Sequence, residues 1–123
     1  MIGALTTLLG RENVLHEKED LIPYSFDATA VLKRMPRAVV FARTAEEVSG
    51  VLKIARSHNA PVVARGSGTG LSGGSVPVEG AVVLCLVKMD RILEVDARNF
   101  TLRAQAGVLT QAIYDAADAE GLF

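Results

Sequence analysis

The sequence predicts an α/β fold of the α+β kind: a small lobe of parallel strands with a βαβ unit, followed by a hairpin. Two apolar runs of strand length, 38–42 and 62–64, flank an amphipathic helical pattern. Strands that are apolar on both faces are typical of parallel sheets joined by a right-handed helical crossover. Farther along, 91–95 and 101–106 alternate around a four-residue turn at 96–99, the pattern of an antiparallel hairpin.

The helix between the first two strands carries its own start and stop signals. Thr44 and Glu47 have the spacing of a capping box, in which the threonine hydroxyl accepts from the Glu47 N–H and the glutamate reaches back. Asn59 suits a left-handed stop, and Pro61 prevents continuation. The expected apolar face of this helix consists of Val48, Val51, Leu52 and Ala55.

Helical patterns also open and close the sequence. Apolar residues recur at helical spacing over 2–9, and Gly10 follows as a stop signal. Periodicity is lost over 11–37, where we expect 17–20 to be a solvated stretch. A third buried strand is expected at 81–87. A final helix should carry Leu109, Ile113, Ala116 and Ala117 on one face and end at Gly121.

Composition narrows the class of protein. The chain has 123 residues, a formal charge of −1 and a single cysteine. These values argue against a disulfide framework, a multi-thiolate metal site and a nucleic-acid footprint. We find no signal peptide pattern and no apolar run of membrane-spanning length, so we expect a cytoplasmic protein. We interpret Cys85 as a small buried hydrophobe, His16 as a surface residue and His58 as a helix-end residue.

The most informative segment is rich in glycine and directly follows the second strand. Five glycines fall within nine residues, and hydroxyl side chains alternate with them. Glycine admits positive φ and close ligand approach, and successive N–H groups in such turns form an anion-binding nest. Arg65 adds a fixed positive charge at the strand end. We therefore predict a pyrophosphate site made by Arg65, Gly66, Ser67, Gly68, Thr69, Gly70, Leu71, Ser72, Gly73, Gly74 and Ser75.

Other interpretations of this segment fit less well. A P-loop requires a lysine after its last glycine, and none is present. Residues 68–73 satisfy G-x-G-x-x-G, but the dinucleotide fingerprint also needs a helix that opens within the glycines. Here another strand follows instead. A connecting loop with no ligand-binding role would have little reason to contain five glycines, because ordering each glycine costs conformational entropy on folding.

The segment from Arg65 to Gly74, with Pro61 before it and Pro77 after it, resembles the FAD-binding loop of the vanillyl-alcohol oxidase/PCMH flavoprotein family. The similarity is greatest to the branch of FAD-linked 2-hydroxyacid dehydrogenases, which includes D-lactate dehydrogenases and the FAD-linked chain of glycolate oxidase. Further matches support this branch: Tyr24-Ser25-Phe26-Asp27, the βα step over 36–48, the segment 89–92, and 106–108 with 120–122.

The resemblance implies that 21–123 form the first lobe of a PCMH-type FAD-binding domain, preceded by a helix and lead-in at 1–20. The second lobe and the substrate cap of the family have no counterpart in these 123 residues. The glycine-rich segment would then hold the FAD pyrophosphate. Some relatives attach FAD through a histidine in this loop, and none occurs here, so the resemblance implies non-covalent FAD.

What the resemblance implies for function is a flavin-dependent oxidation of a 2-hydroxy acid of the glycolate or D-lactate type. No catalytic or metal-ligating residue is assigned within the chain, because His16 and His58 match no catalytic position. An iron-sulfur or other electron-transfer subunit is an expected partner. We expect the fragment alone to be inactive and to self-associate. The alternatives are a non-catalytic nucleotide- or phosphate-binding module and a purely structural domain.

Overall fold

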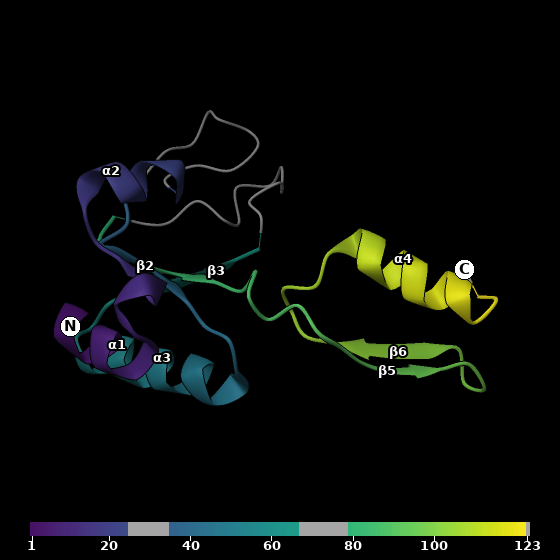
Figure 1. Ribbon diagram of the computed structural model, residues 1–123. Coiled ribbons are helices and arrows are strands. Elements are labelled where there is room, and N and C mark those ends of the chain that lie inside the picture. The colour runs from purple at the N-terminus through teal and green to yellow at the C-terminus, as the bar shows by residue number, and fades with distance from the viewer. Residues whose placement is uncertain (25–34, 67–78, 123) are drawn as a thin grey trace.

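The computed structural model describes residues 1–24, 35–66 and 79–122. Two groups of elements are visible in Figure 1: a sheet with helices on both faces, and a hairpin covered by one helix. The first group contains α1 (Ile2–Leu9), η1 (Arg11–Asn13), β1 (Val14–Leu15), α2 (Lys18–Leu21), η2 (Ile22–Tyr24), β2 (Ala38–Phe41), α3 (Ala45–Ser57), β3 (Val62–Arg65) and β4 (Val82–Cys85). The second contains β5 (Ile92–Asp96), β6 (Thr101–Ala104) and α4 (Thr110–Ala119). The predicted mixed fold with a parallel-strand lobe and a hairpin is confirmed.

The four-stranded sheet has the order β1-β2-β4-β3. β2 and β3 each pair in parallel with β4, and β1 pairs antiparallel with β2. The predicted parallel strands on either side of α3 are therefore present, but they are not neighbours, because β4 lies between them. β4 is buried at every position, as a central strand of a two-sided sheet must be.

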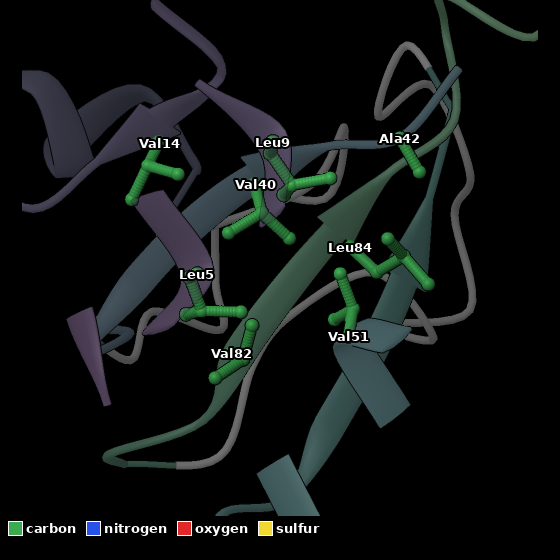
Figure 2. Close-up of a cluster of buried hydrophobic side chains, with 8 residues drawn as sticks. All are labelled: Leu5, Leu9, Val14, Val40, Ala42, Val51, Val82 and Leu84. Atoms are coloured by element: carbon green, nitrogen blue, oxygen red, sulfur yellow. The ribbon is translucent and has the colours of Figure 1, made fainter. Parts of the chain in front are cut away.

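Helices cover the two faces of this sheet unequally. α1 and α3 lie on one face, and Figure 2 shows their side chains meeting those of the strands in the larger core cluster. That cluster consists of Leu5, Leu9, Val14, Val40, Ala42, Val51, Val82 and Leu84. The opposite face carries a smaller cluster of Leu21, Val39, Val83 and Cys85, flanked by Leu15, Tyr24, Met35 and Phe41. α1, expected as part of a lead-in, thus contributes two fully buried leucines to the core of the lobe.

The start of α3 follows the sequence prediction, with one difference. The Thr44 hydroxyl accepts a hydrogen bond from the Glu47 N–H at 3.1 Å. The Glu47 carboxylate reaches back as expected, but it accepts from the backbone N–H of Arg43 at 2.8 Å and from the Arg43 guanidinium at 2.7 Å. At the other end, Asn59 has the predicted left-handed conformation with φ 53°, and His58 contacts the Ile54 carbonyl oxygen at 3.0 Å.

Glu47 gives this helix start a pH dependence. The side-chain hydrogen bond from Arg43 lowers the pKa of the Glu47 carboxyl, against the opposing effect of its burial. A carboxyl whose pKa is lower in the folded state contributes stability above its unfolded pKa and loses it as pH falls through the folded value. We expect the free energy of unfolding of Glu47→Gln to fall below that of the native chain at pH 7, and this gap to close below about pH 4. Urea titrations from pH 3 to 8 measure it. Glu46→Gln, the same charge change in the same turn, should show a smaller gap; an equal one would contradict the assignment.

Several short elements are not expected from the sequence. β1, α2 and η2 lie in 11–37, where periodicity is lost, although 17–20 are exposed as predicted. The prediction for the apolar face of α3 includes Leu52, but 47% of its surface is exposed, so only Val51 and Ala55 of that face are fully buried. The terminal helix begins after Leu109, which is 67% exposed. The two helix corrections share a cause, because each helix packs against a small sheet and buries a narrower stripe than its apolar residues offer.

The hairpin is attached to the lobe through its base. β5 and β6 pair antiparallel, as predicted, with a bulge between Ile92 and Glu94. The Gly107 N–H donates to the Met89 carbonyl at 2.9 Å, and the Gln105 N–H donates to the Arg91 carbonyl at 2.8 Å. α4 lies along the hairpin (Figure 1), and none of its residues is buried.

Candidate cofactor-binding edge of the sheet

The three parallel strands end side by side, and their last residues form one row. Phe41 of β2 is in register with Cys85 of β4, and Cys85 is in register with Arg65 of β3. Residues in register on parallel strands point to the same face, which here is the face of the smaller cluster. Ligands of open α/β sheets bind beyond the carboxyl ends of the strands, so this row lies where a ligand is expected.

Arg65 is the most unusual member of the row, because it is charged and only 8% exposed. Its guanidinium carbon lies 4.9 Å from the centroid of the Tyr24 ring, which η2 brings over the row. A cation over an aromatic face contributes about 0.5–1 kcal/mol at exposed sites and about 2 kcal/mol when desolvated, and here the ring is half-buried. The Arg65 carbonyl accepts from the Leu86 N–H at 2.9 Å, so the backbone of this residue is held by the sheet as well.

Tyr24 remains neutral beside this cation at physiological pH. Burial raises the pKa of its phenol above the ordinary value; the nearby Cys85 thiol adds to the rise, and the Arg65 guanidinium opposes it. The pair is therefore a cation on a neutral ring.

A second cation and ring continue the arrangement. The Tyr24 and Phe41 rings meet edge to face with centroids 6.1 Å apart. The Lys88 Nζ lies 5.1 Å from the Phe41 centroid and donates to the Oδ1 of Asn13, a side chain that is 1% exposed. Neither Lys88 nor Phe41 is among the site residues predicted from the sequence. A usable signal is present for Lys88, since it is a basic residue just after a buried strand.

The structure describes two of the predicted site residues. Arg65 ends β3 as expected, and Gly66 follows it. Among the described residues, no heavy atom would lie within 4 Å of a Cβ on Gly66, so this part of the chain leaves the Gly66 backbone open to an approaching group. The remaining predicted residues, Ser67 to Ser75, lie outside the described residues and stay a prediction.

The other residues considered for chemistry behave as structural ones. Cys85 is 2% exposed, with its Sγ 3.7 Å from the Gly66 carbonyl oxygen. His16 is exposed, and its Nδ1 lies 3.6 Å from the Oε1 of Glu17. Within the described ranges, no three histidine, cysteine or acidic side chains gather as metal ligands would. In that same part of the chain, no helix combines the length and the apolar character needed to cross a membrane.

Residues 36–123 match the model of a family described as "FAD binding domain". The chain belongs to this family. This FAD-binding domain is 41% identical over 119 residues to the glycolate oxidase subunit GlcD of Bacillus subtilis, covering 97% of the chain and 25% of the relative. It is 47% identical over 104 residues to a D-lactate dehydrogenase of Archaeoglobus fulgidus, covering 80% of this chain and 23% of that relative. The chain thus spans about a quarter of the length of these curated relatives.

Solved structures agree with the sequence relatives. p-Cresol methylhydroxylase with bound substrate superposes with a TM-score of 0.84 at 32% identity, covering 98% of this chain and 24% of that protein. The resemblance to the vanillyl-alcohol oxidase/PCMH flavoproteins is therefore confirmed, and FAD is the cofactor of the domain.

The described edge of the sheet fits this cofactor. A pyrophosphate needs positive charge and open backbone N–H groups. Arg43, Arg65 and Lys88 follow or end β2, β3 and β4 respectively, so each parallel strand delivers a cation to the same edge. Arg43 is paired with the Glu47 carboxylate. Arg65 lies over the Tyr24 ring, and Lys88 lies over the Phe41 ring. Gly66 offers the open backbone.

Proposed function

We propose that this domain is the N-terminal FAD-binding portion of a flavin-dependent oxidoreductase that acts on a 2-hydroxy acid of the glycolate or D-lactate type. The observation that carries the proposal is the buried Arg65 at the carboxyl end of β3, followed at once by Gly66 and the glycine-rich segment. Relatives over most of this chain include proteins named for glycolate, D-lactate and D-2-hydroxyglutarate oxidation. All three names refer to 2-hydroxy acids.

The residues of this chain would bind and orient the cofactor. Arg65 would supply positive charge toward the pyrophosphate, and the N–H groups from Gly66 to Ser75 would donate to its oxygens. No histidine lies in that segment, so we propose that FAD is held without a covalent bond. When bound, FAD supplies the two-electron chemistry, which no side chain of this domain provides.

We propose further that the 123 residues alone do not turn over a hydroxy acid. The relatives are about four times as long, and the remaining three quarters of their length has no counterpart here. A cofactor held from one side leaves its reactive ring unsupported. In the whole protein, a separate electron-transfer subunit, such as an iron-sulfur protein, would accept the electrons; the word "subunit" in the name of the Bacillus subtilis relative is consistent with this.

The experiment uses the protein expressed from the complete reading frame that encodes these residues, purified with FAD. We expect flavin absorption bands. On acid precipitation of the protein, the bands should remain in the supernatant and not in the pellet, as a non-covalent cofactor requires. We also expect dye reduction with glycolate or D-lactate. A coloured protein that reduces no dye with any 2-hydroxy acid would favour a non-catalytic nucleotide-binding module. A colourless protein would overturn FAD binding itself. Gly70→Val, within the glycine-rich segment, should abolish the flavin bands.

Exposed apolar side chains predict that the isolated chain self-associates. Leu93, Phe100, Leu109 and Tyr114 of the hairpin and α4 region are between 51% and 78% exposed. A concentration of large apolar side chains on a surface favours association. Light scattering should give a mass of at least two chains at high concentration, and Phe100→Ser with Tyr114→Ser should lower it. A monomer at every concentration would contradict this prediction.

A further inference from the structure

A lysine reaches across the carboxyl edge of the sheet and has no role in the proposed function. Lys88 follows β4, and its Nζ lies 5.1 Å from the centroid of the Phe41 ring at the end of β2. The same Nζ donates to the Oδ1 of Asn13, the residue directly before β1. One ammonium group therefore connects the end of β4 with the end of β2 and the start of β1.

Asn13 is the buried polar residue that fixes this lysine. Its side chain is 1% exposed, and its Nδ2 donates to the Leu9 carbonyl oxygen, at the end of α1, at 2.9 Å. Its Oδ1 accepts from Lys88. An amide bonded at both ends has one orientation, because turning it over would place donor against donor and acceptor against acceptor. Asn13 therefore holds the Lys88 ammonium at a defined point of the edge.

The chemistry of these contacts differs from that of the neighbouring cation. The Arg43 guanidinium is paired with the Glu47 carboxylate at 2.7 Å. Within the described ranges, Lys88 instead contacts an amide oxygen and an aromatic ring, both of them neutral. Neutral partners attract an ammonium without cancelling its charge. Lys88 is also exposed, and an ammonium has three donors, so an anion from outside the chain can bind to it.

We propose that Lys88 binds the FAD pyrophosphate, and that Asn13 is the positioning residue that holds its ammonium at this edge. This inference rests on the proposed function. The pyrophosphate is the part of oxidised FAD that is charged at neutral pH, so it is the part that an ammonium would recognise. Asn13 lies before the 36–123 match to the FAD-binding family, so the lead-in segment would serve the cofactor as well as the core.

The first test measures the dissociation constant of FAD from the apo-form of the complete protein, by quenching of flavin fluorescence. Lys88→Met should raise the constant about ten-fold, whereas Lys88→Arg, which keeps the charge, should leave it within about three-fold. The constant of the native protein should also rise more steeply with salt concentration than that of Lys88→Met, because salt screens a charge pair. A lysine that only tied two segments together would not change this salt dependence.

The second test concerns Asn13. Asn13→Ala should raise the dissociation constant in the native background and have no further effect in a Lys88→Met background, because the two side chains act as a unit. Its melting temperature should fall in both backgrounds, since the Leu9 carbonyl loses its partner in each. Asn13→Asp places a carboxylate against the ammonium and should weaken FAD binding as much as Lys88→Met. This second variant serves if Asn13→Ala does not fold.

A control variant removes the same charge elsewhere. Lys53 is exposed on the half of α3 that leads away from the carboxyl edge. Lys53→Met should leave both the dissociation constant of FAD and its salt dependence unchanged.

The outcomes separate the two proposals. A native protein that binds no FAD overturns the proposed function and, with it, this inference. A native protein that binds FAD overturns the inference alone in three cases: if Lys88→Met binds FAD equally well, if its salt dependence is that of the native protein, or if Asn13→Ala weakens binding equally with and without Lys88. Rescue by arginine together with coupling between Asn13 and Lys88 supports it.

Discussion

Gly107→Ala should destabilise the attachment of the hairpin by about 3 kcal/mol, the upper end of the usual cost of overpacking. A Cβ on this residue would overlap the Leu86 carbonyl oxygen and its carbon, and it would lie 3.0 Å from the Met89 carbonyl oxygen. Both neighbours are backbone atoms, which cannot turn aside as a side chain does. The overlap is relieved only if 105–108 move away from 86–89, which breaks the Gly107 to Met89 hydrogen bond.

Native-state hydrogen exchange measures this result directly. The amides of Gln105 and Gly107 should exchange more than about 100-fold faster in the variant, in line with about 3 kcal/mol. The amides of β2 and β4 should change far less. Gly3→Ala is the matched control, since a Cβ there meets nothing within 4 Å and alanine is the better helix former. Equal exchange at Gly107 in the native chain and the variant would show that the Leu86 contact does not exist.

Leu5→Ala should cost about 2–5 kcal/mol of the free energy of unfolding. Leu5 is fully buried in the larger core cluster, where α1 and α3 meet the sheet (Figure 2). The lobe is small, and the described part of its core on this face has eight buried side chains, so removal of one leucine leaves a cavity that few neighbours can fill. A loss of this size is a large fraction of the total stability of a small domain.

Urea denaturation followed by circular dichroism measures the loss. The matched control is Leu52→Ala on α3, a leucine that is 47% exposed, for which we expect a change below about 1 kcal/mol. The prediction also tests whether α1 belongs to the folded lobe. If Leu5→Ala were as mild as Leu52→Ala, α1 would be a lead-in that docks weakly.

The elements that the sequence predicts best are those whose signals are local. The capping residue Thr44, the left-handed Asn59 and the two-sided apolar runs identify β2, α3 and β3 without any knowledge of the rest of the chain. The hairpin is of the same kind, because its alternation and its turn are close together in the sequence. The position of β4 between β2 and β3 could not be obtained this way, since several strand orders satisfy the same apolar pattern.

The candidate site also contains residues that local sequence signals predict and residues that they do not. Arg65 and Gly66 are predictable because they adjoin a conspicuous cluster of glycines. Tyr24 enters the sequence prediction only as part of a resemblance, and its contact with Arg65 joins distant parts of the chain through short elements that carry no periodicity. Four residues in α2 and two in β1 are too few to show a repeat. Their structure comes from packing against the sheet.

The place of β4 sets the order in which the sheet can be completed as the polypeptide is made. β2 and β3 leave the ribosome before β4, and they do not pair with each other, because the strand that lies between them is Val82–Cys85. Until that strand emerges, α3 can form on its own capping signals, but β3 has no partner among the described strands already made. The carboxyl edge that carries Arg65 is therefore assembled only after the glycine-rich segment has been synthesised, because that segment lies between β3 and β4 in the sequence.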